Sequence, residues 1–192
     1  MQQNVLENQL SREEQLALKN RRLGMNIFQL SWIMVFICLV VVNLQLRRSQ
    51  ESWPPPGVER MGVVLPTLAT ITLLISGFAA RRALQSLRRD AVQPFLSQWL
   101  VTIGLGVLFV AMMIYEWMIV PQGSQYGSIF RVMIGFHGIH ALVIGGYLWN
   151  VYQNGRKNMY GQFNTWAVEA GAKLWYFVVF AWILFYVVLY WI

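Results

Sequence analysis

Five long apolar stretches, separated by short segments of charged or turn-forming residues, run through this chain of 192 residues. They cover residues 25–46, 61–80, 95–120, 129–152 and 173–192. An α-helix needs about 20 mostly apolar residues to cross the hydrocarbon core of a bilayer, and each stretch reaches that length. Inside lipid every backbone polar group must be paired, and the alternating segments of a membrane β-barrel are absent. The sequence therefore predicts an all-α integral membrane bundle of five transmembrane helices.

Composition supports lipid as the main solvent. Apolar residues make up 57% of the chain and charged residues only 12%, against about a quarter charged in soluble proteins. A soluble domain of this size would expose large apolar patches. The formal charge of +7 could indicate nucleic-acid binding, but the basic residues form short clusters beside the apolar stretches. That placement indicates membrane orientation, so we expect membrane lipids and no nucleic acid as partners.

The basic residues are distributed unequally between the two predicted sides of the membrane. One side carries Arg12, Lys19, Arg21, Arg22, Arg81, Arg82, Arg88, Arg89, Arg156, Lys157 and Lys173. The other side carries only Arg47, Arg48, Arg60 and Arg131. Because cytoplasmic loops are enriched in Lys and Arg, we expect a cytoplasmic N-terminus and a C-terminus outside. The predicted location is the cell inner (cytoplasmic) membrane, with several passes.

Residues 1–24 differ from the rest, being polar and charged of both signs. They lack the apolar core and small-residue cleavage site of a secretory signal, so we expect a cytoplasmic N-terminal segment. Ser11 and Glu14 have the spacing of a capping box, which predicts a short surface helix over residues 12–22. The chain thus divides into this segment and a five-helix transmembrane domain over residues 25–192.

Ionisable residues inside the apolar stretches are few, and each is a candidate for function. Glu116 lies near the end of the third stretch and Arg131 near the start of the fourth. A short connection between antiparallel helices would place both at similar depth. We expect either an ion pair between them or two side chains that extend separately to the outer interface.

His137 and His140 are three residues apart and so share one face of the fourth predicted helix. A metal or haem could use such a pair, but the chain has only these two histidines. Bis-histidine haem ligation normally takes one ligand from each of two helices. We therefore favour packing against neighbouring helices, which small residues on the same helix would allow. These small residues are Gly135, Gly138, Ala141 and Gly145.

The remaining polar groups indicate packing as well. The second stretch carries hydroxyls at Thr67, Thr70, Thr72 and Ser76, which can bond their own helix or a neighbour. The single cysteine, Cys38, excludes an intrachain disulfide and is interpreted as a small buried hydrophobe. Aromatic residues at the predicted interfaces indicate headgroup contacts: Trp53, Trp117, Tyr152, Trp166, Trp175, Tyr190 and Trp191. No catalytic, cofactor-binding or metal-binding residue is predicted.

Three segments, taken in order, resemble subunit III of haem-copper oxidases, the cytochrome c and quinol oxidases. The first is the outer loop Trp53, Pro54, Pro55, Pro56 and Gly57. The second, residues 135–140 (Gly-Phe-His-Gly-Ile-His), is similar to the family's Gly-Phe-His-Gly-x-His signature. The third begins at Glu169 and continues through Trp175 to residue 191, and Glu116 with its neighbours matches a further family element.

The resemblance implies the five-helix form of this subunit, which lacks the first two helices of the seven-helix form. It implies an accessory role without a redox centre in a proton-pumping terminal oxidase of aerobic respiration. The catalytic core, subunit I with subunit II, would hold haem and copper. Subunit III would bind phospholipids, stabilise subunit I and support proton uptake.

The chain also departs from the family pattern. The family commonly has a buried Ser-Glu pair in its first shared helix, where this chain has Ser31 and Trp32. Tyr176 and Val179 replace a histidine and an aspartate of the closing motif, Lys173 replaces an aromatic residue, and Arg131 stands where an aromatic residue is usual. Ideas about proton handling by the family's carboxylate therefore do not transfer to this chain.

The sequence leaves two alternative functions open. Five-helix proteins of this kind also serve as accessory proteins of nitric oxide reduction. An unrelated small transporter or enzyme could use His137 and His140 as a substrate or metal site, but a transporter predicts charges at mid-membrane, broken helices or repeats. None is visible in the sequence.

Overall fold

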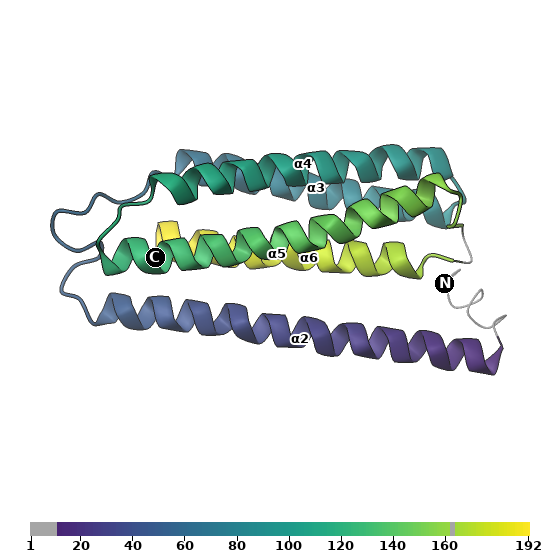
Figure 1. Cartoon of the computed structure of the whole chain (residues 1–192), viewed down its shortest axis with the longest axis horizontal. Helices are drawn as coiled ribbons and strands as arrows, with labels where there is room; N and C mark the ends of the chain where they lie inside the picture. The colour runs from purple at the N-terminus through teal and green to yellow at the C-terminus, as the bar shows by residue number, and fades with distance from the viewer. Residues whose placement is uncertain (1–10, 162–163) are drawn as a thin grey trace. The chain divides into compact units, whose positions relative to one another are not determined.

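The computed structural model describes residues 11–161 and 164–192, and all regular structure within them is helical (Figure 1). The elements are α2 (Arg12–Arg48), α3 (Val64–Arg88), α4 (Val92–Ile119), α5 (Gln125–Arg156), α6 (Trp166–Tyr186) and a π-helical turn, η1 (Val187–Trp191). Five of these helices, with η1 continuing α6, are long and apolar enough to cross a membrane. The prediction of an all-α fold with five membrane-spanning helices is confirmed.

The chain divides into two compact units, of which the first ends at Ile37. Its described part is the N-terminal portion of α2. The Ser11 backbone N–H donates to Glu14 Oε2 at 2.9 Å and the Glu14 N–H donates to Ser11 Oγ at 3.3 Å, which confirms the capping box. The expected short helix over residues 12–22 continues directly into the first apolar stretch. Only Leu23 and Gly24 separate them, and one glycine costs a helix only about 1 kcal/mol.

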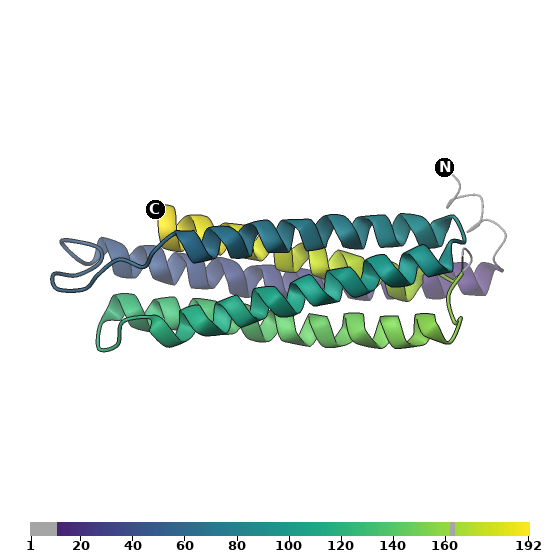
Figure 2. The same ribbon diagram turned by 90° about the horizontal axis from the view of Figure 1, so that it is seen from above.

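The second unit, residues 38–192, contains a four-helix bundle. α3 packs against α4, α4 against α5, α5 against α6, and α6 against α3, which closes the ring. Each helix runs antiparallel to the one before it (Figures 1 and 2). Short connections favour this up-and-down arrangement.

At one end of this bundle α3 and α5 finish in the same way. Asp90 and Asn158 adopt positive φ angles of 57° and 54°. The Ala91 N–H donates to Ser86 O at 3.0 Å, and the Met159 N–H donates to Asn154 O at 3.2 Å. These bonds define two Schellman motifs, in which Asp or Asn takes the position that glycine usually fills. We name this end the basic end, after Arg81, Arg82, Arg88, Arg89, Arg156, Lys157 and Lys173.

The opposite end holds the α4–α5 connection and the loop of prolines, and we name it the proline-loop end. Ser124 caps α5, its Oγ accepting from the Gly127 N–H at 3.0 Å. Gly127 has no room for a side chain, since a Cβ there would run into the carbonyl oxygen of Pro121. The chain can therefore turn from α4 into α5 within a few residues.

The helices extend beyond the predicted apolar stretches. α3 continues past residue 80 to Arg88, and α6 begins at Trp166 rather than at Lys173. Charged residues suggest helix boundaries in the sequence, but exposed Arg and Lys side chains are well tolerated within helices. The ends of the apolar stretches thus do not mark the ends of the helices.

Both the inside and the outside of the bundle are apolar. Trp99, Phe109, Phe130 and Trp182 are fully buried, whereas large side chains such as Phe78, Val107, Ile139 and Phe180 are more than 60% exposed. An outer surface of this kind suits contact with lipid. Cys38 lies on the exposed surface, so its interpretation as a buried residue is wrong. An apolar environment in the sequence does not distinguish the core from the lipid-facing side.

Candidate functional site

The two histidines of α5 lie in the core of the bundle. His137 is 0% and His140 is 2% exposed, and their ring centroids are 6.3 Å apart. The ring of His137 is 5.6 Å from Phe109 of α4 and 5.5 Å from Trp182 of α6, measured between centroids. The ring of His140 is 5.4 Å from Phe177. Aromatic rings from α4 and α6 thus enclose the two imidazoles.

This enclosure bears on the question of a metal site. Across residues 11–161 and 164–192, no three His, Cys, Asp or Glu side chains come together in a group that could hold a metal ion. A closed metal site normally needs four ligands, and even an open one needs three protein ligands. His137 and His140 lie among aromatic side chains of α4 and α6.

The small residues around the histidines divide into two groups. A Cβ on Gly135 would lie 3.3 Å from the Trp117 ring nitrogen, so α4 approaches closely there. Gly138 and Gly145 have nothing within 4 Å of an added Cβ. The prediction of close packing therefore fits Gly135 and the buried Ala141, and is wrong for Gly138 and Gly145 within the bundle α3–α6.

Glu116 and Arg131 do not form the expected ion pair in the described part of the chain. Arg131 donates through Nη2 to the carbonyl of Val120 at 2.9 Å, and its Cζ lies 5.6 Å from the centre of the Trp117 ring. Val120 and Trp117 lie at the end of α4, where the last backbone carbonyls have no partner within the helix. The guanidinium therefore caps α4 instead of reaching the carboxyl group.

Glu116 does not extend to the surface either, being only 1% exposed. Within the described residues, its Oε2 and the hydroxyl of Tyr190 in η1 are both buried and make no hydrogen bond. Tyr190 in turn packs its ring 5.3 Å from Phe130, between centroids. Glu116 thus belongs to the interior of the bundle near its proline-loop end.

A ladder of three side-chain hydrogen bonds joins α3 to α6. Trp175 Nε1 donates to Ser76 Oγ at 3.0 Å, and Trp182 Nε1 donates to Thr70 Oγ1 at 2.8 Å. The hydroxyls of Thr67 and Tyr186 are 2.7 Å apart. We name these three pairs the α3–α6 ladder. The hydroxyl face of the second stretch is a packing face, as predicted, whereas Thr72 bonds only within its own helix, to Leu68 O.

The prediction that Trp175 and Tyr190 contact lipid headgroups is wrong, because both side chains are buried in the bundle. Trp175 is 1% and Tyr190 3% exposed. A Cβ on Gly106, in the middle of α4, would lie only 2.7 Å from the Trp175 ring. Trp175 is therefore a core residue at mid-bundle, and its indole N–H finds a partner there, as a buried tryptophan requires.

The proline loop is fixed to the start of α5. The Val58 N–H donates to Pro55 O at 3.1 Å, with Pro56 and Gly57 between them and Gly57 at a φ of 82°. This is a type II turn, which favours proline followed by glycine at its centre. The Trp53 ring packs edge-on against Tyr126 at 5.5 Å between centroids, and the Tyr126 hydroxyl accepts from the Met61 N–H at 3.1 Å. The motif thus holds the loop against the bundle.

Glu169 belongs to the basic end. Its Oε1 accepts from Thr165 Oγ1 at 2.8 Å and lies 3.3 Å from Arg88 Nη2. The sequence singled out Glu169 only through the family motif, and the pairing with Arg88 was missed. The sequence signals this pair only by the basic residues at the end of α3 and the acidic residue in the first turn of α6.

The fold and this interior define a class: a multi-pass helical membrane protein whose buried polar side chains lie between packed helices. Residues 4–192 match the family described as cytochrome c oxidase subunit III. The chain therefore belongs to the cytochrome c oxidase subunit III family, the subunit III family of haem-copper oxidases.

Individual relatives agree with this assignment. Cytochrome c oxidase subunit 3 of Thermostichus vulcanus is 30% identical over 88% of this chain and 86% of its own length. The subunit of a Synechocystis species is 29% identical over 88% of this chain and 75% of its own. The subunit of Drosophila melanogaster is 31% identical over 88% and 68%. Similarity thus extends over most of the bundle, well beyond one motif.

Proposed function

We propose that this chain is the accessory, non-redox subunit III of a proton-pumping, oxygen-reducing haem-copper terminal oxidase. It stabilises subunit I, in a complex with subunit II, and supports proton uptake by that core. Membership of the subunit III family supports this role most directly. The complex reduces oxygen to water, and this chain contributes structure to it.

The interior of the bundle supports a structural role. Each indole of the α3–α6 ladder bonds a hydroxyl across the helix interface, and the two histidines are enclosed by aromatic rings. The chain has two histidines in all, three residues apart on α5. Haem and copper would therefore be held by the partner subunits, as the family resemblance implies.

The distribution of charge supports a location and an orientation. The basic end carries most of the Lys and Arg residues of the bundle, so it would face the cytoplasm in a cell inner membrane. The proline-loop end and the C-terminus would then face outward. Membrane lipids would cover the exposed apolar side chains of α3, α4 and α5.

Isolation of the complex tests this function. The chain, tagged at its C-terminus, would be purified in mild detergent from native membranes grown with oxygen. The co-purifying chains would be identified by mass spectrometry, and oxygen uptake would be measured with a chemical electron donor. We expect subunits I and II and an oxygen uptake that is sensitive to cyanide. Recovery of other partners, with no oxygen uptake from gently extracted membranes, would contradict the proposal.

A further inference from the structure

Arg131 lies inside α5 and not at one of its ends, six residues or about 9 Å from the first residue of the helix. Its Nη2 donates to the carbonyl of Val120 at 2.9 Å, and its Cζ lies 5.6 Å from the centre of the Trp117 ring. Its Nε is buried and makes no hydrogen bond to any described residue. Both contacts are with uncharged groups, and no carboxylate in the described part of the chain forms an ion pair with Arg131. The positive charge therefore has no counter-charge there.

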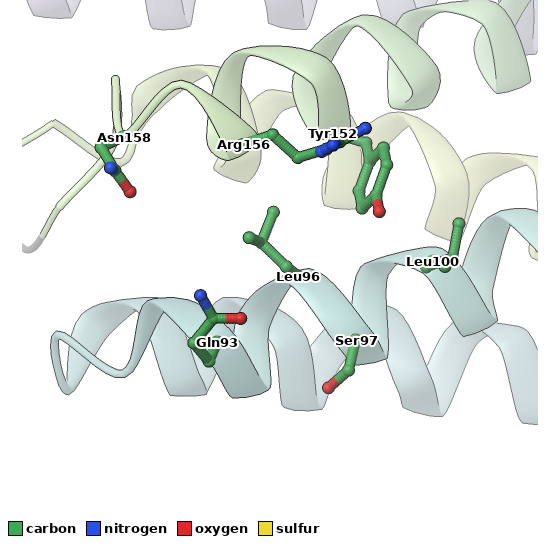
Figure 3. Close-up of a pocket in the computed structure, with 7 residues that line it drawn as sticks. All are labelled: Gln93, Leu96, Ser97, Leu100, Tyr152, Arg156 and Asn158. Atoms are coloured by element: carbon green, nitrogen blue, oxygen red, sulfur yellow. The ribbon is translucent and has the colours of Figure 1, made fainter.

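The other arginine of α5, Arg156, is the last residue of the helix and is exposed. It borders an open groove between the start of α4 and the end of α5, and Figure 3 shows the side chains that line this groove. A side chain at an exposed helix end can be hydrated, whereas a charge inside a membrane helix is costly unless a partner compensates it. Arg131 therefore needs a counter-charge from outside the described chain, and Arg156 does not.

The surface beside Arg131 has the composition of a protein interface. The Trp117 ring is 45% exposed although the guanidinium packs against it. Met118 and Val132, which follow these two residues in the sequence, are more than half exposed. Arg, Met and aromatic residues are enriched in interfaces, and Trp and Arg carry much of the binding energy there. A surface that contacts only acyl chains would not contain an arginine, so a protein is the favoured occupant.

The face of α5 that begins at Arg131 continues with small residues. Gly138 and Gly145 follow it at intervals of seven residues, and Leu142 lies between them on the same face. A Cβ added at Gly138 or Gly145 would meet nothing within 4 Å, and Leu142 is 56% exposed. Small residues allow the backbones of membrane helices to approach closely. The described helices leave this face open, so it can accept a helix from another chain.

We propose that this face of α5, with Trp117 of α4, docks a transmembrane helix of a partner subunit whose Asp or Glu side chain pairs with Arg131. Gly138 and Gly145 admit the partner's backbone, and its carboxylate lies about 10 Å from Gly138 toward the proline-loop end. The guanidinium has further N–H donors for a carboxylate while Nη2 stays on Val120. Such a charge pair fixes the register of the two helices. In the complex this helix replaces lipid along the face.

Cross-linking in native membranes tests the pair. Arg131→Lys keeps the positive charge and supplies a primary amine. Dicyclohexylcarbodiimide condenses such an amine with a neighbouring carboxyl group to an amide and is itself converted to the urea. Neither α4 nor α5 contains a lysine of its own, so mass spectrometry of the product assigns the bond to position 131. We expect an amide to one Asp or Glu of one partner chain.

Two outcomes of this experiment would overturn the pair. A bond from position 131 to Glu116 would place the counter-charge within this chain. The absence of any protein product in assemblies that retain their partner chains would indicate a lipid phosphate as the counter-charge. The docking requires the proposed assembly with partner subunits, but it does not depend on the reaction that the assembly catalyses. A cross-link to a chain that is not an oxidase subunit would therefore support the docking and contradict the oxidase role.

The matched control is the double variant Arg131→Gln with Val132→Lys. It places the same amine at the next position, about 100° around α5. We expect a yield of the same product roughly fivefold lower than in R131K, because the amine no longer faces the docked helix. Equal yields would overturn the proposal, since they would indicate random collisions and not a docked pair.

Gly138→Leu tests the close approach of the partner helix. The new side chain meets open space within this chain, so the bundle itself should fold as before. We expect a roughly tenfold loss in the amount of partner chains that co-purify per tagged chain, because the leucine blocks the partner's backbone. Gly104→Leu, at an equally open position on a different face of α4 from Trp117, should lose less than about twofold. Equal losses in the two variants, or full retention in G138L, would overturn the docking.

Discussion

The indoles of Trp175 and Trp182 each donate to a hydroxyl of α3, that of Ser76 and that of Thr70 respectively. In lipid there is little hydrophobic drive between helices, so packing and interhelical hydrogen bonds carry more of their association. A tryptophan that donates to serine or threonine supplies both contact area and one directed bond. The α3–α6 ladder therefore specifies, more clearly than any other set of side chains, which faces of α3 and α6 pack together.

The bond between Trp182 and Thr70 can be measured by a double-mutant cycle. Trp182→Phe keeps an aromatic ring but removes the N–H, and Thr70→Val removes the acceptor with little change in volume. We expect a coupling energy of about 0.6 kcal/mol, with an upper bound of about 1.7 kcal/mol, in the free energy of unfolding in detergent. Thr72→Val is the matched control, because Thr72 bonds only to Leu68 O. A coupling with Trp182 as large at Thr72 as at Thr70 would contradict the ladder.

Glu116 and Arg131 provide a second test at this scale. Arg131 caps the end of α4 and Glu116 is buried in the bundle without an ion pair to Arg131, so the two side chains should act independently. The losses of stability in Glu116→Gln and Arg131→Gln should add in the double variant within about 0.5 kcal/mol. Thermal unfolding of the purified assembly measures all three. A double variant more stable than R131Q alone would restore the ion pair that the sequence suggested.

Residue types and spacing in the sequence indicate which polar groups lie within the long apolar helices, but not what they contact. His137 and His140 were correctly expected on one helix face, since i and i+3 positions always share one. Arg131 binds the backbone carbonyl of Val120, which is unpaired because α4 ends there. The sequence does not show at which residue α4 ends. The burial of Trp175 depends on Gly106, which is 69 positions away in the sequence and far beyond the range of any local pattern.

At the scale of elements, α4 and α6 approach each other closely where Gly106 faces the Trp175 ring. The ring is fully buried and its Nε1 is bonded to Ser76, so it has little freedom to move aside. Helix starts and ends were harder to predict than the helices themselves. Lys173 marked a boundary in the sequence, yet α6 begins seven residues earlier at Trp166, because an exposed lysine is compatible with helix.

Two glycines on α4 form a matched pair for this contact. A Cβ at Gly106 would lie 2.7 Å from the Trp175 ring, whereas Gly104 has nothing within 4 Å. Gly106→Ala should reduce the free energy of unfolding by about 1–3 kcal/mol, as overpacking does in cores. Gly104→Ala should be neutral or stabilise by up to about 1 kcal/mol through helix propensity. Comparable destabilisation by both substitutions would show that Trp175 does not set the spacing of α4 and α6.

For the whole molecule, the uneven charge of the two bundle ends predicts an orientation that the fold alone leaves open. The number of spans followed from the sequence because length and apolarity suffice for a lipid-spanning helix. The order in which helices α3–α6 pack around their ring did not follow from the sequence, because it depends on which faces of α3 and α6 meet. The family assignment rests on several motifs in order, including the proline loop and the histidine signature.

Reporter fusions test the orientation. Alkaline phosphatase, which is active only outside the cytoplasm, would be fused after Ile192 or after Arg89 in the α3–α4 connection. We expect high activity from the first fusion and little from the second, because the basic end should remain in the cytoplasm. Immunoblots would correct for expression. The reverse pattern would place the proline loop inside the cell.

The role of the histidines can be tested on the assembled complex. If His137 and His140 are packing residues of the core, alanine at both positions creates a cavity and should lower the yield of assembled complex. A cavity of this kind costs several kcal/mol. The haem content of each complex that does assemble should not change. Haem loss from intact complexes, measured by pyridine haemochrome against protein, would make these residues ligands.

In the proposed role, this chain accompanies the haem of the oxidase without binding it. The reduced-minus-oxidised spectrum, with and without carbon monoxide, would be recorded on the complex purified through this chain. It would then be recorded on the separated fractions after a harsher detergent releases the chain. We predict a haem spectrum with a carbon-monoxide-binding component that stays entirely with the remaining subunits, and a colourless released chain. Haem that leaves with this chain, or a gently purified preparation without any haem, would contradict the account.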